Sequence, residues 1–326
     1  MASTALWFSI VASRFVLVPQ PTPKISQRNS SVWSGHPIGH YGGLMTSTPD
    51  PFTQAVTARM SEQLAGVGRL GVAFSGGVDS SVLLALAARV LGPDRVVAVL
   101  GVSPSLAADE RYAAHEVARH IGVPVIEVDT HEGDRAEYRA NGPDRCFHCK
   151  DELFTRIDDN VVSAHRLDAV AYGENADDVA RPDRPGARAA AAHRVLRPLA
   201  GAGLDKAAVR RIAHAFALPC ADKPAAPCLA SRIPHFSLVS VQKLGQVERA
   251  EAALRRLGFA DLRVRHHGEI ARVELPPEDL IRAVTDPLRS SVHEAVTRAG
   301  FRFVTVDLAG LQSGAFTVAY LRASGD

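Results

Sequence analysis

The chain is poor in cysteine, in aromatic residues and in charge of one sign. Its 326 residues include only 4 cysteines, too few for a disulfide framework. Lysine and arginine (37 together) nearly balance aspartate and glutamate (35), which leaves a formal net charge of +2. Basic residues are mixed with acids and form no long run, so the composition does not indicate a nucleic-acid-binding surface. The length allows two domains with separate cores.

Long apolar runs are also absent. The apolar segments 6–13 and 15–18 are interrupted by Arg14 and are too short to cross a membrane. No positively charged side chain precedes the first of them, which argues against a secretory signal peptide. Proline, serine and glycine then dominate up to residue 50. We therefore expect residues 1–50 to be a disordered extension, or sequence upstream of a true start near Met45.

The most informative segment is the loop 75–81, which reads Ser-Gly-Gly-Val-Asp-Ser-Ser. It follows an apolar, strand-like run (70–74) and precedes a run of helix formers (82–91). A loop between a strand and a helix N-terminus presents free N–H groups and the positive end of the helix dipole to an anion. The spacing fits neither the Walker loop nor the dinucleotide fingerprint. The sequence predicts a phosphate-binding loop, with an ordinary serine-capped helix as the alternative.

Each polar or small residue of this loop has an expected role. The glycines would allow close approach of phosphate, the hydroxyls would donate hydrogen bonds, and the carboxylate could hold Mg²⁺ beside the phosphates. The candidate residues are Ser75, Gly76, Gly77, Asp79, Ser80 and Ser81. Two later positions join them. Gly173 follows the apolar strand 168–172, and Lys206 lies near a helix start, where it could reach phosphate or could be a solvated surface lysine.

Strands and helices alternate up to about residue 220, which predicts an α/β fold with a parallel sheet and right-handed crossovers. In such sheets, ligands bind at the carboxyl ends of the strands, where the loop 75–81 is expected. From residue 235 the pattern changes. A helix over 241–257 is followed by alternating strands over 262–267 and 270–275, further helices from Pro276, and a last strand over 301–306. This part predicts a small α+β domain.

Two arginines in the C-terminal part have the spacing of one strand face. Arg263 and Arg265 would lie side by side and suit a phosphate or carboxylates, although a solvated polar face is the alternative. His266 and His267 are adjacent on the same strand. Because adjacent strand residues point to opposite faces, these histidines should not share a metal ion.

Three of the four cysteines form a candidate sulfur or metal site. Cys146 and Cys149 have C-x-x-C spacing, and Cys228 follows a turn-rich loop. The flanking Arg145 and Lys150 would lower the thiol pKa values. Half a zinc site, a redox pair and an iron–sulfur site all fit the spacing. Three thiols would leave one iron of a [4Fe–4S] cluster open to an exogenous sulfur ligand. The fourth cysteine, Cys220, is expected to be a buried apolar residue.

The loop 75–81 resembles the PP-loop of the ATP pyrophosphatases. Together with the segments 141–154, 173–178 and 222–234, it makes the chain similar to the LarE family from about Met60 to the C-terminus. These are ATP-dependent sulfur transferases that build the nickel-pincer nucleotide cofactor of lactate racemase. The resemblance implies a PP-loop Rossmann-like domain over 51–234 and a substrate or oligomerisation domain over 235–326.

The resemblance also implies the chemistry. ATP with Mg²⁺ would adenylate a carboxylate of pyridinium-3,5-biscarboxylic acid mononucleotide, and sulfur would then replace oxygen and give a thiocarboxylate. In some family members a lone cysteine matching Cys228 gives up its own sulfur; members with all three cysteines hold a [4Fe–4S] cluster. This chain has all three, which favours the cluster. The implied substrate-binding residues are Ser231, Arg232, Glu251, Arg263 and Arg265.

Further expectations follow from this reading. The protein should be cytoplasmic, should bind a small-molecule nucleotide but neither nucleic acid nor membrane, and should form a homo-oligomer. The chain departs from the family pattern at Cys220–Ala221, at His235–Phe236 and at Gln312, where an arginine is common. These departures concern substrate recognition more than ATP chemistry. The alternatives are a PP-loop tRNA thiolase, and a nucleotide-binding protein with a structural zinc site.

Overall fold

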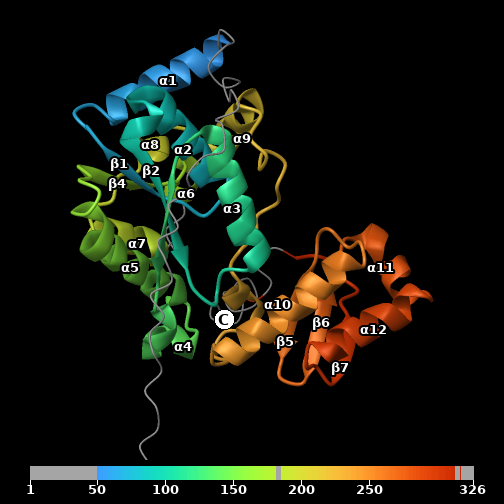
Figure 1. The fold of residues 1–326 in the computed structure, drawn as a ribbon. Helices are drawn as coiled ribbons and strands as arrows, with labels where there is room; N and C mark the ends of the chain where they lie inside the picture. Colours follow the sequence, from blue (N-terminus) through green and yellow to red (C-terminus); the bar gives the residue numbers. More distant parts are fainter. Residues whose placement is uncertain (1–49, 181–184, 313–315, 317–326) are drawn as a thin grey trace, which may run out of the picture. The chain divides into compact units, whose positions relative to one another are not determined.

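The computed structural model describes residues 50–180, 185–312 and 316 (Figure 1). The predicted extension over residues 1–50 therefore lies outside the described residues, apart from Asp50. From Asp50 onward, the described residues belong to one compact unit. Within it, one sheet lies between residues 70 and 172 and a second between residues 263 and 306.

The first sheet has four parallel strands. They are β1 (Leu70–Ala73), β2 (Val96–Val102), β3 (Val125–Asp129) and β4 (Ala169–Tyr172), in the order β3-β2-β1-β4. The predicted α/β fold with a parallel sheet is confirmed. Because β1 lies between β2 and β4, the loop that follows it begins where strands pair on both sides.

Helices cover both faces of this sheet (Figure 1). Side chains of β2 alternate between two cores, with Ala98 and Leu100 on one face and Val97 and Val99 on the other. The first face packs against α1 (Pro51–Gln63), α2 (Val78–Leu91), α3 (Ala108–Ile121) and α9 (Lys206–Ala215). The second packs against α5 (Arg145–Ile157) and α7 (Pro185–Ala192).

Short helical segments complete this part of the chain. They are η1 (Pro93–Arg95), η2 (Glu132–Asp134), α4 (Ala136–Ala140), η3 (Asp158–Val162), α6 (Ala176–Val179), α8 (Pro198–Gly201) and η4 (Leu229–Arg232). Residues 222–227, which the sequence predicts to be turn-rich, form no regular helix or strand.

Helix α2 begins four residues earlier than the sequence predicts, at Val78 rather than Val82. Gly77 is its N-cap, and the hydroxyls of Ser80 and Ser81 donate to the Gly77 carbonyl at 3.1 and 2.8 Å. These bonds fold the second half of the loop into the first helical turn. The predicted phosphate loop is therefore shorter than expected, and two of its hydroxyls are already used inside it.

The C-terminal part is a small mixed sheet covered by helices. Its elements are α10 (Val241–Arg256), β5 (Arg263–His267), β6 (Ile270–Glu274), α11 (Pro277–Val284), α12 (Leu288–Arg298) and β7 (Phe303–Val306). The hairpin of β5 and β6 is confirmed, while β7 pairs parallel to β6. The predicted helix over 241–257 is also confirmed, and Gly258 follows it with φ 88°.

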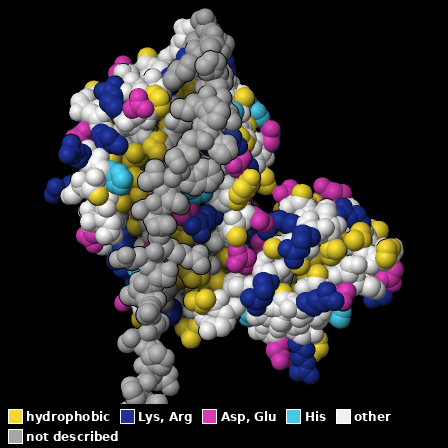
Figure 2. Space-filling model, in the orientation of Figure 1, with side chains coloured by type: hydrophobic (Ala, Val, Ile, Leu, Met, Phe, Trp, Pro, Cys, Tyr) yellow, Lys and Arg dark blue, Asp and Glu magenta, His cyan; other side chains and the backbone are white. Residues whose placement is uncertain are grey.

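The two adjacent histidines of β5 point in opposite directions, as predicted. His266 is buried and lies 3.1 Å from the Gln246 amide oxygen, whereas His267 is exposed. Lysine and arginine side chains are interspersed with aspartate and glutamate over the face of the molecule that Figure 2 shows. In the described ranges, no helix has the length and apolar character needed to cross a membrane.

Candidate functional site

One cavity of about 630 Å³ brings the three predicted groups of residues together. From the phosphate loop it is lined by Ser75, Gly77 and Asp79, with Lys206 beside them. From the thiol group it is lined by Cys146 and Cys228. From the predicted substrate-binding group all five members line it: Ser231, Arg232, Glu251, Arg263 and Arg265. The remaining predicted residues, Gly76, Ser80, Ser81, Cys149 and Gly173, are not part of the lining.

The phosphate loop starts at the carboxyl end of β1. The Ser75 backbone N–H donates to the Ser80 hydroxyl oxygen at 3.2 Å, and the two hydroxyl oxygens are also 3.2 Å apart. Ser81 is fully buried. These contacts fix the loop's shape, and they leave Ser75, Gly77, Val78 and Asp79 as the loop residues that line the cavity.

Two glycines permit close packing around the loop. Gly76 has φ 70°, and a Cβ there would lie 2.8 Å from the Cα of Ala114 in α3. A Cβ on Gly173, just after β4, would lie 2.7 Å from the backbone nitrogen of Ser80. Both contacts are with backbone atoms, which cannot move aside as a flexible side chain can. Gly76 and Gly173 therefore shape the loop from outside rather than contact a ligand in the cavity.

Both carboxylate oxygens of Asp79 are engaged. The Lys206 ammonium lies 2.5 Å from Oδ2, and the Asn175 side-chain amide donates to Oδ1 at 3.0 Å. Carboxylate oxygens suit Mg²⁺, so the chemistry of the site fits this ion. A magnesium ion and Lys206 would compete for the same oxygen. Asn175, which also caps α6, was missed as a site residue, although its motif 173–178 was recognised.

The three thiols come from two distant segments. Cys146 and Cys149 lie in the first turns of α5, and Cys228 immediately precedes η4. Cys146 and Cys228 have accessible surface, Cys149 is half-buried, and Cys220 is buried as predicted. Leu229 N–H donates to the Ser105 carbonyl at 3.0 Å, which ties the Cys228 loop to the end of β2.

The predicted lowering of the thiol pKa by the flanking cations is wrong for Cys149. Burial raises the pKa of Cys149 well above its usual value, and the charges of Glu132, Cys228 and Cys146 add to this effect. Burial also raises the pKa of Cys228 and outweighs the opposing charge of Arg145. Although Cys228 lines the cavity, protein atoms surround its other sides. The second flanking cation, Lys150, lies over the Tyr172 ring at 4.3 Å.

The three thiols are chemically suitable ligands for an iron–sulfur cluster, but their side chains are not arranged as a complete ligand set. Each is close enough to another to affect its charge, and three thiolates are the expected donors for a [4Fe–4S] cluster with one open iron. Within the described part of the chain, no group of three or more His, Cys, Asp or Glu side chains has the arrangement that would hold a metal ion. Beside the thiols, Glu132 Oε2 is buried and has no hydrogen-bond partner in the part of the chain that the structure describes.

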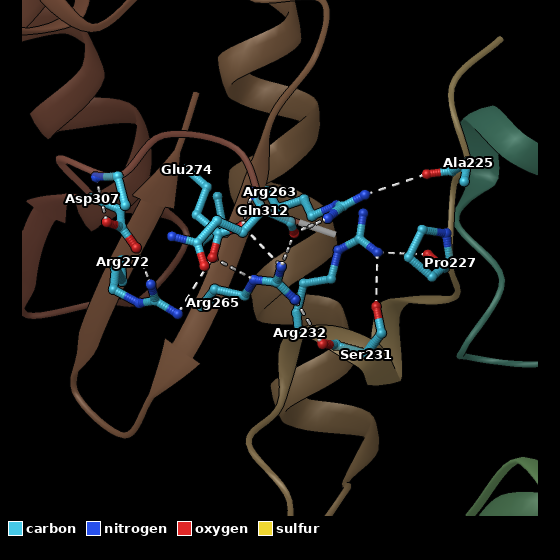
Figure 3. Close-up of polar contacts among 12 residues, drawn as sticks. Ala225, Pro227, Ser231, Arg232, Arg263, Arg265, Arg272, Glu274, Asp307 and Gln312 are labelled. Carbon is cyan, nitrogen blue, oxygen red and sulfur yellow. Dashed lines mark hydrogen bonds and ion pairs between the residues drawn. The ribbon is translucent and has the colours of Figure 1, made fainter. Parts of the chain in front are cut away.

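The arginines at the other end of the cavity are held in different ways (Figure 3). Arg265 pairs with the fully buried Glu274 at 2.8 Å, and Arg232 pairs with Glu251 at 2.9 Å. Arg263 donates instead to backbone carbonyls of Ala225 and Gln312. Burial lowers the pKa of Arg263, and the neighbouring cations Arg265 and Arg232 add to this. An anion at this end of the cavity would therefore be favoured most by Arg263.

Glu251 lies behind the arginines rather than free toward a substrate. One oxygen accepts from Arg232 and from the Val264 backbone N–H, and the other accepts from Arg232 and Arg255. Its carboxylate is thus saturated, and it orients Arg232. The equivalent anchor of Arg265, Glu274, was missed by sequence reasoning. The only indication was its place in the strand next to Arg265, since a buried acid looks like an exposed one in sequence.

Comparisons with known proteins identify the family of the chain. The asparagine synthase family matches residues 50–163. An uncharacterized protein of Synechocystis sp. is 41% identical over 243 residues, or 74% of this chain and 90% of that protein. The pyridinium-3,5-bisthiocarboxylic acid mononucleotide synthase of Lactiplantibacillus plantarum is 32% identical over 260 residues, or 79% and 92%. An uncharacterized protein of Methanocaldococcus jannaschii is 25% identical over 239 residues, or 73% and 88%. The chain belongs to the LarE family of the PP-loop ATP pyrophosphatase superfamily.

Proposed function

We propose that the protein is an ATP-dependent sulfur transferase of nickel-pincer nucleotide biosynthesis. Its substrate would be pyridinium-3,5-biscarboxylic acid mononucleotide, and its product the corresponding thiocarboxylate. The name of the Lactiplantibacillus plantarum relative supports this substrate class. The observation that carries the proposal is the single cavity, because phosphate loop, thiols and arginines all line it. A substrate bound there would meet ATP at one end and sulfur at another without leaving.

The first step would be adenylation. The substrate carboxylate oxygen attacks the α-phosphorus of ATP, the bond to the β-phosphate oxygen breaks, and pyrophosphate leaves. Ser75 and Gly77 would donate to the phosphates from the start of α2, where the helix dipole favours negative charge. Asp79 would hold Mg²⁺. Lys206, released from Asp79, would then be free to neutralise the leaving pyrophosphate.

The second step would be sulfur transfer. A sulfur nucleophile attacks the acyl carbon, the bond to the AMP oxygen breaks, and AMP leaves with that oxygen. Cys146, Cys149 and Cys228 would hold a [4Fe–4S] cluster, which when bound would present an exogenous sulfur at its open iron. Without a cluster, Cys228 would be the sulfur source itself. Cys146 and Cys228 line the cavity. Cys149 is half-buried and does not line it, so it would bind the cluster from the side away from the cavity.

Substrate binding would fall to the arginine end of the cavity. Ser231, Arg232, Arg263 and Arg265 are placed to bind the acidic groups of the nucleotide, since guanidinium groups bind phosphates and carboxylates in pairs. Gln312 presents its backbone carbonyl to Arg263 and Arg265. An anionic substrate group would have to displace that carbonyl or share its donors.

The test is a single-turnover reaction without oxygen, with ATP, Mg²⁺ and the biscarboxylic acid nucleotide. We expect AMP, pyrophosphate and a product in which mass spectrometry shows sulfur in place of oxygen. Asp79→Asn should lower AMP formation at least about a hundredfold, because the metal would lose a charged ligand. AMP formation that survives this change intact would refute the role of the loop. Sulfur incorporation into tRNA, but not into the nucleotide, would favour a tRNA thiolase instead.

A further inference from the structure

Two buried polar side chains join the segments that carry the thiols. Asn141 lies between α4 and α5, is fully buried, and has a left-handed conformation with φ 57°. Arg145 opens α5, directly before Cys146, and only 8% of its surface is exposed. Both contact the loop that carries Cys228. We call Asn141 and Arg145 the clamp.

Asn141 holds the part of the loop that follows Cys228. Its side-chain amide faces the backbone carbonyls of Ile233, Pro234 and Ser237 at 3.2, 2.7 and 3.1 Å. Its own backbone carbonyl accepts from the Phe236 N–H at 3.1 Å. An asparagine tolerates the left-handed region better than most residues. The strained position therefore serves to aim one amide at three carbonyls of a distant segment.

Arg145 holds the part of the loop that is nearest to Cys228. Its Nη1 donates to the Asn141 side-chain oxygen at 2.6 Å and to the Ala230 carbonyl at 2.9 Å. Ala230 lies in η4, two residues after Cys228. One guanidinium thus connects the first turn of α5, the Asn141 amide and η4.

The charge of Arg145 is not balanced by an acid. No carboxylate of the described residues lies within ion-pair distance of it, whereas Arg135, Arg232 and Arg265 all have such partners. Its electrostatic neighbours are Cys228 and Cys146, and it lines the cavity. A buried cation without an anion is costly. A sulfur-centred anion at the thiols would supply the missing charge.

We propose that Asn141 and Arg145 are positioning residues of the sulfur step, which hold Cys228 against Cys146 and Cys149, and that ATP activation does not depend on them. The role in the sulfur step rests on the proposed function. The claim that the two side chains hold Cys228 in place rests only on the contacts described above. The phosphate loop has its own supports in Lys206 and Asn175. In the ranges that the structure describes, no hydrogen bond joins the clamp side chains to that loop.

Three variants separate the parts of the clamp. Asn141→Gly removes the amide and keeps a residue that tolerates φ > 0. Arg145→Gln removes the charge, and Arg145→Lys keeps it with a different donor geometry. Arg139→Gln is the matched control, because Arg139 lies in the adjacent helix and its side chain donates, among the described residues, only to the carbonyls of Gly133 and Asp134.

The first measurement needs no substrate. In a Cys149→Ser, Cys220→Ser background, Cys146 and Cys228 are the remaining thiols, and dibromobimane becomes fluorescent when it bridges two thiols. We expect rapid bridging, mapped to these two residues by mass spectrometry. Asn141→Gly and Arg145→Gln should slow it about tenfold, because losing these buried hydrogen bonds would free the loop. Arg139→Gln should leave the rate within about twofold.

The second measurement separates the two steps. With otherwise unmodified chain, Arg145→Gln should leave AMP formation within about twofold and lower thiocarboxylate formation at least about tenfold, with partial recovery in Arg145→Lys. Equal bridging rates in all variants would contradict the proposed role of the clamp. So would a loss of AMP formation in Arg145→Gln as large as the loss of thiocarboxylate formation. If the unmodified chain makes no thiocarboxylate, the proposed function is wrong, but the bridging rates still test whether the clamp positions Cys228. If Asn141→Gly does not fold, the two Arg145 variants decide.

Discussion

At the scale of single residues, side chains that line the cavity depend on partners behind them: Asn175 donates to Asp79, and the buried Glu274 pairs with Arg265. Ser75, Asp79 and Cys228 all line the cavity, as a pattern-based argument expects. The residues that support the site escaped prediction. Asn175, which donates to Asp79, and Glu274, which pairs with Arg265, are recognised only by what lies beside them in space. The pKa of Cys149 was mispredicted for the same reason. Flanking cations are visible in sequence, but burial is not.

Two glycines of the site should respond differently to an added methyl group. Gly173→Ala would place a Cβ 2.7 Å from the Ser80 backbone nitrogen, so we expect a loss of about 2 kcal/mol in unfolding free energy. At Gly77 the nearest atom would be the Ser75 hydroxyl oxygen at 3.4 Å. Gly77→Ala should therefore fold normally but bind ATP weakly. Denaturant unfolding and ATP titration of both variants would check this, and equal stability of the two would contradict it.

Two neighbouring arginines should separate stability from substrate binding. Arg265→Met would leave the buried Glu274 with only longer contacts, to Arg272 and to the Gln312 backbone N–H among the described residues, at a cost of about 3 kcal/mol in unfolding free energy. Arg263→Met removes a cation that has no carboxylate partner among the described residues. It should leave stability nearly unchanged and raise KM for the nucleotide at least about tenfold. Thermal unfolding and initial rates would test the pair; a reversed pattern would show that Arg263 is the structural member.

At the scale of helices and strands, periodicity predicted the hairpin, the long helix α10 and the parallel sheet. The observed helix boundaries differ from the predicted ones where local hydrogen bonds determine them. Ser80 and Ser81 bond to Gly77 and draw the loop into α2, which helix-forming tendencies alone did not indicate. The short segments η2 and η4 also lacked any periodic pattern.

The junction of α7 with α5 should make stability depend on pH. Burial opposes charge on His193, but hydrogen bonds to Asp158 and Asp151 outweigh it and raise the His193 pKa above its ordinary value of 6.5. A raised pKa in the folded state stabilises the fold fully below pH 6.5, and this contribution is lost as pH rises through the folded pKa.

His193→Gln should therefore lower Tm at pH 5.5 more than at pH 8.5, an expected difference of about 2–4 °C for each kcal/mol lost. Tm scans at both pH values would measure it. His293→Gln, an exposed change on α12, is the control and should show no such difference. The same loss at both pH values in His193→Gln would mean that the ring acts by packing alone.

At the scale of the whole molecule, the arrangement that matters joins segments far apart in the chain. The phosphate loop follows β1, two thiols lie on α5, and the third precedes η4. Of the arginines, Arg232 lies in η4, while Arg263 and Arg265 come from β5. Composition and periodicity could not show that these segments share one cavity. The geometry is consistent with the resemblance to the LarE family, since residues of each of these segments line the same cavity.

A cluster on the three cysteines would link α5 to η4, so its presence should affect the entire fold as well as the reaction. Protein purified without oxygen is expected to contain about four irons with matching sulfide per chain. Since the ligands belong to distant segments, removing the iron should lower Tm by several degrees. Cys228→Ala should lose both the iron and this stabilisation. Cys220→Ala, a buried thiol away from the cavity, should keep the iron. No iron after reconstitution, together with conversion of Cys228 to dehydroalanine after one turnover, would instead make each chain a single-use sulfur donor.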